Sequence, residues 1–462
     1  MNTMLKKAIS DIRLYPGRFS LVILALVVGI WGVGSILVSY YVLSQDLRQN
    51  YLNTRPAHAI LTSRDFDKLD IGAFRARPEI VAAEFRDYSV HRIEVTPNNW
   101  IPLWLYGVAD FKNMHLARIE SESGRSVPEP GTILVERDGL RISNFETVTD
   151  PRVRLPQGVV RVPVSGISFD PAQAPATQDH FIYAYTDQDS YAQLTGEAIN
   201  HRLIVRLNKV SNRIEVRNII EKLVGEFSAR NIHVNKVLIP QFNQHPHQWQ
   251  LDTLMLLQGS ISLLAFAMAA VLVSQLMASM LARQIRQIGV LKAIGASRVQ
   301  VCGIYATTVL LLGVAASLVG VPLAVASGYG FSYFVAYQLN FDILTTDLPL
   351  AVYLAIITVS ILLPLILSLS TMLKGTRISV REAVSDYGIN VNTPGTKNTA
   401  KKWSALPNNM VMALRNVMRR KQRLVLTLLT MALGVAMFST GFNVRESLAT
   451  LLQEAGDSMR YD

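Results

Sequence analysis

Few residues in this sequence have the type and spacing that chemistry requires. The tripeptide His245-Pro246-His247 contains two side chains able to ligate a metal ion. Proline separates them in a polar stretch with no neighbouring Cys or carboxylate, which is more typical of a connection than of a metal site. Asp65 and Asp67 have the residue type of an acid and base pair, but their setting indicates a charged turn. We therefore predict no catalytic residue and no metal ligand.

The sequence also lacks the short motifs that mark common enzymes. No G-x-x-x-x-G-K-[ST], G-x-S-x-G or H-E-x-x-H string occurs. Without the first of these the chain cannot hold nucleotide phosphates in the P-loop manner, so any ATP hydrolysis must belong to another polypeptide. A membrane-anchored enzyme has no motif in its favour.

The composition indicates a membrane protein. Of 462 residues, 50% are hydrophobic and 17% are charged, and the hydrophobic residues occur in long runs. The formal net charge of +11 does not indicate nucleic-acid binding, because many basic residues flank apolar runs and no run alternates them with aromatic residues. Cys302 is the single cysteine, so the part of the chain outside the membrane must be stabilised by packing rather than by disulfides.

Long apolar runs predict several membrane spans. Residues 1–18 have the pattern of a cytoplasmic interfacial helix that Pro16-Gly17 breaks. The run that follows is too long for a cleaved signal peptide. Ionisable residues are almost absent from the runs, which argues against a secondary transporter. We predict transmembrane helices at residues 19–43, 251–280, 301–337, 348–373 and 423–443. Gly320, Pro322, Gly328 and Gly330 predict a tilted or kinked third span.

Residues 44–250 have a soluble composition and predict a large α+β domain. Strand, helix and extended patterns occur near both ends of this region, at residues 57–62, 68–76, 81–95, 201–207, 212–230 and 232–239. Short strands separated by Pro, Gly and Asp lie between them, at residues 131–136, 159–165 and 181–185. We expect a split β-α-β portion whose halves meet, with a β-rich insertion. The predicted fold class is an α-helical membrane protein with a large extracytoplasmic α+β domain.

Residues 281–300, which we call the coupling element, lie between the second and third predicted spans. Helical spacing of apolar residues continues into this element, so we predict one helix over residues 251–294, about 65 Å long at the standard rise. Gly289 and Gly295 bracket a short apolar turn. Ser297 and Gln300 have the spacing of a capping box that starts the next helix.

The coupling element resembles the signature of FtsX/MacB-like permeases of ABC transporters. That signature reads roughly as two basic residues, Glu-Ile-Gly, two aliphatic residues with a base, and Ala-Ile-Gly-Ala. Residues 286–296 resemble it, with Gln287 in place of Glu. Residues 376–386 are similar to the short tail after the last helix of that family, with Val380 in place of a proline. Residues 183–196 look like a strand and helix of the MacB-like outer domain, which in that family is likewise divided into an α+β portion and a β-rich portion.

The sequence also indicates an internal repeat. Residues 413–434 resemble residues 8–29 at a constant offset of 405, with Gly29 matching Gly434. We predict a duplicated permease whose second copy is truncated. Residues 374–422 would be a cytoplasmic linker and the start of the second repeat, and residues 444–462 the extracytoplasmic start of a second outer domain.

Basic residues predict the orientation. Lys and Arg cluster before the first span, in the coupling element and after the fourth span. Since short cytoplasmic loops hold such residues, the amino terminus is expected in the cytoplasm and residues 44–250 outside it. We predict a multi-pass protein of the bacterial inner membrane.

The resemblance implies a function. It implies the membrane permease subunit of an ABC transporter, which passes motion of a separate cytoplasmic ABC ATPase to the outer domain and so exports or extracts a hydrophobic substrate. ATP and Mg would bind that partner, with no cofactor in this chain. The alternative is an FtsX-like regulator of an extracytoplasmic partner such as a cell-wall hydrolase. A second permease copy stays open as a further partner. The expected ATPase-coupling residues are Arg283, Arg286, Gln287, Ile288, Gly289, Val290, Leu291, Lys292, Ile294, Gly295 and Ala296.

Overall fold

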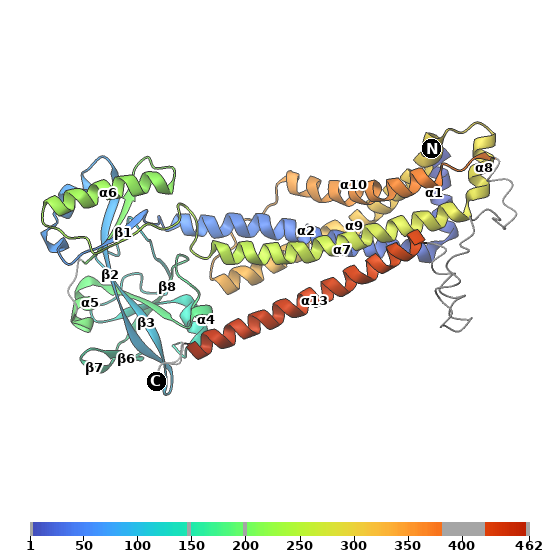
Figure 1. Cartoon of the computed structure of the whole chain (residues 1–462). Helices are drawn as coiled ribbons and strands as arrows, with labels where there is room; N and C mark the ends of the chain where they lie inside the picture. The colour runs from blue at the N-terminus through green and yellow to red at the C-terminus, as the bar shows by residue number, and fades with distance from the viewer. Residues whose placement is uncertain (1–2, 146–148, 197–200, 381–420, 459–462) are drawn as a thin grey trace, which may run out of the picture. The chain divides into compact units, whose positions relative to one another are not determined.

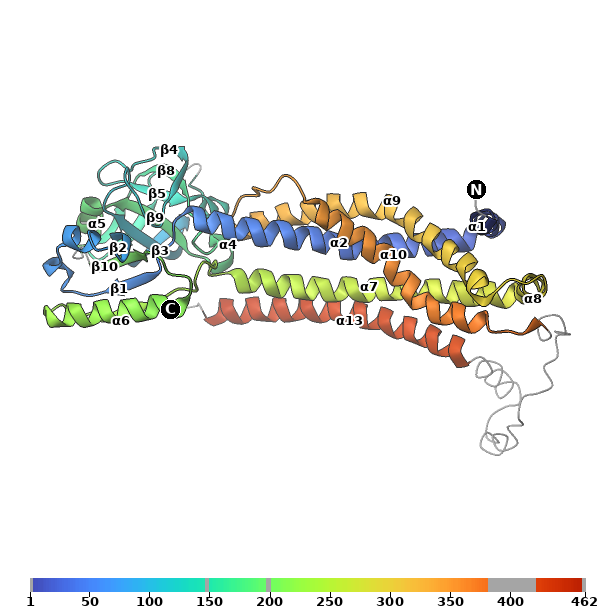
Figure 2. The same ribbon diagram turned by 90° about the horizontal axis from the view of Figure 1, so that it is seen from above.

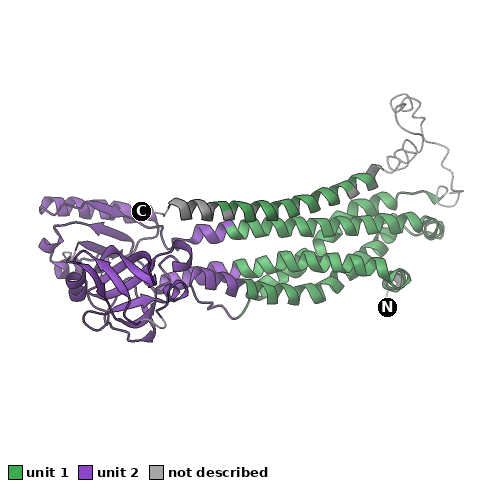
Figure 3. Ribbon diagram, turned by 90° about the horizontal axis from the view of Figure 1, so that it is seen from below, with its two compact units in different colours: residues 1–40, 254–331, 347–462 green, residues 41–253, 332–346 purple. Residues whose placement is uncertain are grey.

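The computed structural model describes residues 3–145, 149–196, 201–380 and 421–458. The chain divides into two compact units (Figure 3). We call residues 1–40, 254–331 and 347–462 the helical unit. Residues 41–253 and 332–346 form the sheet unit. Helices α2, α7 and α9 contribute residues to both units.

The helical unit contains the long apolar helices (Figure 1). Among the described residues, four helices are long and apolar enough to cross a membrane. They are α2 (Pro16–Asn53), α7 (Gln248–Arg283), α9 (Arg298–Leu339) and α10 (Leu350–Gly375). The shorter helices are α1 (Thr3–Leu14) and α8 (Ile285–Ala293). As predicted, the first helix ends before Pro16, which begins α2 at the position where a missing N–H is tolerated.

Small residues let the helices of this unit approach closely. A Cβ atom on Gly328 of α9 would lie 2.6 Å from Cβ of Val38 in α2. A Cβ atom on Gly34 of α2 would lie 2.7 Å from Cβ of Ala324. Ser39 adds a hydrogen bond, because its hydroxyl donates to the Gly328 carbonyl at 3.0 Å. Lipid offers no hydrophobic drive for helix association, so close backbone contact and interhelical hydrogen bonds provide it.

A fifth long helix, α13 (Lys421–Ser458), lies in the same unit. Helices α2 and α13 are both 38 residues long, and α13 begins and ends 405 residues after α2 does. The glycines matched by that offset lie near neighbouring residues of α7, since Cβ atoms on Gly29 and Gly434 would approach Phe266 and Met268 respectively. The duplication and the fifth span stay predictions, and residues 381–420 and 459–462 lie outside the described part of the chain.

The first half of the sheet unit is built from two segments that lie far apart in the sequence. One segment follows α2 and the other precedes α7. The strands of this half are β1 (Ala59–Thr62), β2 (Ile80–Thr96), β10 (Arg202–Leu207) and β11 (Lys236–Leu238). They are ordered β11-β1-β10-β2 and all pair antiparallel. Because β1 pairs with β10, the prediction that the two halves meet is confirmed.

Helix α6 (Arg213–Ala229) covers the core of this half. Its buried residues Val216, Ile220, Leu223 and Phe227 follow helical spacing, and they pack with Leu61 and Leu203 of the sheet. Asn212 caps the helix by accepting hydrogen bonds from the Ile214 and Glu215 amides, both at 3.0 Å. The helix predicted over residues 212–230 is therefore confirmed.

The second half is the β-rich portion. Its strands are β3 (Asn99–Val108), β4 (Glu120–Gly124), β5 (Ile133–Glu136), β6 (Arg152–Leu155), β7 (Gly158–Arg161), β8 (Val164–Phe169) and β9 (Ile182–Asp187). Their order continues from β2 as β3-β9-β5-β8-β4, with β6 paired to β2 and β7. Short helices η2 (Arg137–Ile142), α4 (Ala176–Asp179) and α5 (Gln188–Thr195) connect them. The predicted β-rich insertion is confirmed.

Three predicted elements differ in detail. The predicted strand 159–165 is two strands, β7 and β8, because Pro163 between them has no amide hydrogen for the ladder. The predicted helix 68–76 is η1 (Phe66–Lys68) followed by α3 (Ile71–Arg75), since Asp70 caps a new helix by accepting from Gly72 and Ala73. The predicted strand 232–239 is only β11. The predicted fold class, a helical membrane protein with a large α+β domain, is confirmed.

Candidate functional site

The coupling element does not continue α7 as a single helix. Helix α7 ends at Arg283, Gln284 has φ −99° and ψ 14°, and α8 begins at Ile285. The buried Gln284 side chain accepts a hydrogen bond from the Tyr305 hydroxyl at 2.8 Å. Figures 1 and 2 both show α8 turned across the direction of α7. The prediction of one helix over residues 251–294 is therefore wrong, because the helix breaks at Gln284, the residue that bonds to Tyr305 of α9.

The end of α8 and the start of α9 follow the local sequence. Gly289 lies inside α8 rather than at the edge of a turn, which corrects that part of the prediction. Gly295 has φ +98° and follows the last turn, where the Ala296 amide donates to the Leu291 carbonyl at 2.9 Å. The Ser297 amide donates to Gln300 Oε1 at 2.8 Å, and the Gln300 amide donates to Ser297 Oγ at 3.2 Å. The predicted capping box is confirmed.

Two lysines hold α8 against other parts of the helical unit. Lys7 of α1 donates to Gln287 Oε1 at 3.1 Å and forms an ion pair with Asp11 at 2.8 Å. Lys292 donates to the carbonyl oxygens of Thr376 at 2.5 Å and Ile378 at 2.7 Å, just after α10. Desolvation and the nearby Arg298 lower the pKa of Lys292. Lys292 was expected to contact a partner protein. In the structure its ammonium group donates hydrogen bonds to carbonyl oxygens of the same chain.

The predicted apolar contact residues divide into buried and exposed ones. Ile288 is buried in its own unit, so its expected role as an apolar contact for a partner is corrected. Leu291 is half-buried. Val290 is exposed, and Ile294 is 77% exposed. Val299, which was not predicted, is 81% exposed in the first turn of α9. An aliphatic residue two positions after a cap-forming serine was the available signal.

Exposed basic residues occur on α8 and at the helix ends of the same unit. Arg286 lies on the same side of α8 as Val290 and Ile294, at intervals of four residues. The Arg283 guanidinium lies 5.8 Å from the centre of the Tyr15 ring. The other exposed basic side chains of α1, the start of α2, the start of α9 and the end of α10 are Lys6, Arg13, Arg18, Arg298, Lys374 and Arg377. The α8 region therefore presents a small apolar surface near positive charge, which suits a contact with an acidic protein groove.

In the sheet unit, polar contacts bind residues 332–346 to the β-rich portion. Buried Glu136 accepts a hydrogen bond from Asn340 Nδ2 at 2.7 Å, and Arg137 pairs with Asp342 at 2.9 Å. Arg141 donates to the Tyr337 carbonyl at 2.7 Å. Burial raises the pKa of Glu136 to about 8, although the hydrogen bonds from Asn340 and the Asp138 amide oppose the shift. These contacts fix the segment that follows α9.

The histidine pair His245 and His247 and the carboxylate of Asp65, which the sequence disfavoured as functional sites, make hydrogen bonds or ion pairs within the chain. Both ring nitrogens of His245 are engaged, because Nδ1 accepts from the His247 amide at 3.0 Å and Nε2 donates to the Pro171 carbonyl at 2.7 Å. Burial lowers the pKa of His245 to about 4. Asp65 pairs with Lys68 at 2.7 Å, as expected for a charged turn. Within the described residues, no group of three metal-ligating side chains occurs.

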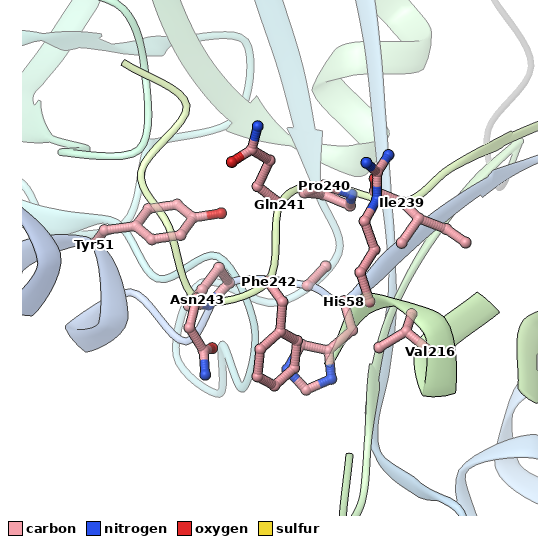
Figure 4. Close-up of a pocket in the computed structure, with 11 residues that line it drawn as sticks. Tyr51, His58, Val216, Ile239, Pro240, Gln241, Phe242 and Asn243 are labelled. Atoms are coloured by element: carbon pink, nitrogen blue, oxygen red, sulfur yellow. The ribbon is translucent and has the colours of Figure 1, made fainter. Parts of the chain in front are cut away.

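One small cavity in the sheet unit is lined by Tyr51, His58, Arg213 and Phe242 among others (Figure 4). Its cavity volume is about 10 Å³, room for about one water molecule and far below that of ligand sites. His58 Nδ1 accepts from the Leu207 amide at 3.2 Å, and burial with the nearby Arg206 lowers the pKa of His58 to about 4. A neutral histidine in so small a space has the features of a structural group.

The long apolar helices define the class of the chain as a membrane protein, and the comparisons with known proteins narrow that class for part of the chain. Residues 259–380 match the family model described as FtsX-like permease C-terminal. This segment includes α8 and the whole coupling element, so the resemblance noted at residues 286–296 is confirmed. The chain therefore carries an FtsX-like permease domain. A search of curated proteins finds no match.

Solved structures with similarity to the chain include three extracytoplasmic or permease domains. The periplasmic region of MacB from Actinobacillus actinomycetemcomitans has 13% identity and a TM-score of 0.28, covering 45% of this chain and 97% of that one. The extracellular domain of the noncanonic ABC-type transporter YknZ from Gram-positive bacteria has 8% identity and a TM-score of 0.27, covering 39% and 99%. A domain of a putative permease protein from Porphyromonas gingivalis has 13% identity and a TM-score of 0.26, covering 39% and 85%.

Proposed function

We propose that this chain is the membrane permease subunit of an ABC transporter, and that a separate cytoplasmic ATPase binds the coupling element. The observation that carries the proposal is the exposed apolar group of Val290, Ile294 and Val299, together with exposed basic residues, within the permease-family segment. Exposed aliphatic residues that lie together outside the membrane often mark a binding site, because a partner that covers them removes them from water. ATP and Mg would bind that partner, and this chain would contain no cofactor of its own.

The orientation proposed from the sequence fits this arrangement. The exposed basic residues of α1, α8 and the end of α10 occur in segments adjoining the apolar helices. Positive residues of short loops stay in the cytoplasm, so the amino terminus and α8 would be cytoplasmic in a bacterial inner membrane. The sheet unit would then lie outside the cytoplasm and act on a hydrophobic substrate such as a lipid, lipoprotein, peptide or drug.

The contacts of α8 indicate how motion would pass into the membrane. Because α8 is separate from α7, a force on Ile294 would not act along one continuous helix. It would act through Lys7 on α1 and through Lys292 on the residues that follow α10. We infer that the ATPase moves several spans together, with Gln284 as the point where α8 changes its angle to α7.

The test compares two isoleucine substitutions with the same chemistry. Ile294→Asp places a charge in the proposed contact, whereas Ile214→Asp changes a residue of α6 that is 72% exposed in the sheet unit. We expect Ile294→Asp to weaken co-purification of the ATPase from native membranes by about 30-fold or more, because an interface would bury an unpaired charge. Ile214→Asp should leave it unchanged. Equal recovery of the ATPase with both variants would remove the proposal.

A regulator that moves no substrate is the second candidate, and exposed Tyr88 and Arg92 on strand β2 favour it by offering a surface for a partner outside the cytoplasm. Both candidates need the ATPase. They differ in what ATP hydrolysis brings about, so an assay of the full complex reconstituted in vesicles distinguishes them. ATP-dependent loss of labelled lipid or lipoprotein from the membrane supports transport, and its absence together with ATP-dependent activation of a bound partner supports regulation.

A further inference from the structure

Aromatic rings of three adjacent strands stack on one face of the sheet unit. The rings of Tyr88 in β2 and Trp104 in β3 are parallel, with an interplanar angle of 1° and centroids 5.1 Å apart. Tyr88 also stacks on Tyr106 at 5.6 Å, and Tyr106 stacks on Tyr185 of β9 at 5.5 Å. Tyr106 and Tyr185 are buried, whereas Tyr88 is 38% exposed. The stack therefore begins in the core and ends at the surface.

Apolar side chains extend this surface along the strands. Val90, two residues from Tyr88 on the same face of β2, is 52% exposed and lies in register with Trp104. Val159 of β7 is also exposed, and it is in register with Arg154 of β6. Tyr88 and Val90 of β2 and Val159 of β7 are thus exposed apolar residues on nearby strands. A group of this kind is a feature of binding surfaces.

Arginines occupy the same face. Arg92 of β2 lies directly in register with Arg154 of β6, and Arg152 lies in register with Arg161 of β7. Like charges directly opposite each other on neighbouring strands are destabilising. Arg152 has a compensating ion pair with Glu94 at 3.2 Å, and Arg161 has one with Asp150 at 2.9 Å. Arg92 and Arg154 are both exposed and place two positive charges side by side.

Aromatic rings lie against Arg154 and against a further arginine, Arg202. The Arg154 guanidinium lies 4.9 Å from the centre of the Trp100 ring, and Arg202 lies 4.7 Å from that of Tyr88. Cation–π contacts keep the arginine planes over the rings and leave their N–H groups available to carboxylates. We call Tyr88, Val90, Trp100, Trp104 and Val159 with Arg92, Arg152, Arg154 and Arg202 the aromatic–arginine face.

We propose that the aromatic–arginine face binds a partner protein through a segment in which acidic residues flank apolar ones. Charge complementarity determines the chemistry of the segment, because carboxylates would relieve the repulsion between Arg92 and Arg154 while apolar residues cover Tyr88 and Val90. Tyr, Trp and Arg are the residues that dominate binding energy between proteins. On this face Tyr88, Arg92 and Arg154 are exposed, and Trp100 and Trp104 are half-buried. The inference does not depend on ATPase binding at α8.

A protein segment fits this face better than a lipid chain does. The residues lie on the open face of paired strands, and an acyl chain needs a concave site that encloses most of its surface. A flat face that combines central apolar rings with peripheral charges has the anatomy of a protein interface. Anionic lipid is therefore the alternative that the experiment must separate.

The experiment places a photo-crosslinking amino acid at Val90 in the full chain, expressed in its native membranes. The matched control places it at Ile214, which is more exposed but lies on α6. We expect a protein adduct at Val90 and not at Ile214, and mass spectrometry should locate the crosslink within an acidic segment of the partner. Arg92→Glu combined with Arg154→Glu should reduce the yield by about tenfold or more.

Two further measurements keep the test decisive. Arg154→Ala should reduce the crosslink at Val90 while the thermal midpoint of the purified chain stays unchanged or rises, since a repulsion is removed. A lowered midpoint would mean that the arginine has a structural role instead. Adducts with lipid alone, equal adducts at Val90 and Ile214, or insensitivity to the charge reversal would overturn the proposal. Ile294→Asp should leave the crosslink at Val90 intact, which separates this inference from ATPase coupling.

Discussion

The helical unit and the sheet unit achieve close packing with different residues. In the helical unit, glycines such as Gly328 and Gly34 bring helix backbones together, and hydroxyl groups such as that of Ser39 link them. In the sheet unit, large aromatic residues fill the core, and buried charges such as Glu136 and Asp170 lie among them. Water drives apolar groups together in the second case, but lipid cannot do so in the first.

This difference shows where each unit is sensitive to substitution. Added volume should damage the helical unit, because its helices already touch at their backbones. Lost hydrogen-bond partners and changes of pH should damage the sheet unit, because its buried polar groups depend on their partners. All four predictions below concern the purified full chain in detergent, with thermal or chemical unfolding as the measurement.

Gly328→Ala should have the largest effect. The new methyl group would lie 2.6 Å from Cβ of Val38, so α2 and α9 would have to move apart at a cost of about 3 kcal/mol. Gly330→Ala is the control, because nothing lies within 4 Å of a Cβ atom at that position of the same helix. Similar unfolding midpoints for the two variants would show that close approach does not stabilise this unit.

Glu136 should make the stability of the sheet unit depend on pH. Its folded pKa of about 8 lies above the ordinary value, so the stabilisation is present at low pH and is lost as the pH rises toward about 8. We expect the unfolding free energy to fall by about 2 kcal/mol between about pH 5 and pH 6.5. Glu136→Gln should remove that slope. The same slope in the variant would assign it to other groups.

Tyr185→Phe tests a buried hydrogen bond of the aromatic stack. The Tyr185 hydroxyl donates to Asp170 Oδ2 at 2.7 Å, and both residues are buried. Removing the donor should cost about 1.5 kcal/mol, since the carboxylate loses a partner that water cannot easily replace. Tyr88→Phe keeps a ring at the exposed end of the same stack and should cost little. Equal losses would mean that ring packing, rather than the hydroxyl group, is measured.

Asn212→Ala should have the smallest effect. It removes the side-chain oxygen that caps α6 at the Ile214 and Glu215 amides, which should cost about 1 kcal/mol. Asn212→Asp keeps a capping oxygen and should unfold like the natural chain. If the aspartate variant were as unstable as the alanine variant, the amide nitrogen of Asn212, which donates to Glu215 Oε1 at 2.8 Å, would be the important group.

Much of the fold could be predicted because its signals are local. The break before Pro16 follows from a residue without an amide hydrogen, and α6 follows from apolar spacing between Asn212 and Arg230. The capping box of Ser297 and Gln300 likewise needs only four consecutive residues. The exposed Val290 and Ile294 belong to the predicted coupling residues for the same reason, since they lie within a short recognisable string.

The rest of the candidate site depends on contacts between distant residues. Local sequence does not mark Gln284 as a helix end, and its hydrogen bond with the Tyr305 hydroxyl joins it to another helix. Lys292 looks like a free surface cation until α10 brings the Thr376 and Ile378 carbonyls to it. Arg92 and Arg154 are far apart in the chain, and only strand register places them side by side.

The sequence by itself determined which segments are apolar enough to enter a membrane, where helices begin, and which short string resembles the signature of FtsX/MacB-like permeases. These properties depend on transfer free energy and on hydrogen bonds between near neighbours. The tertiary structure alone decided which side chains of that string are exposed and which strands bring like charges together. Both depend on packing between segments far apart in the sequence, which no local pattern encodes.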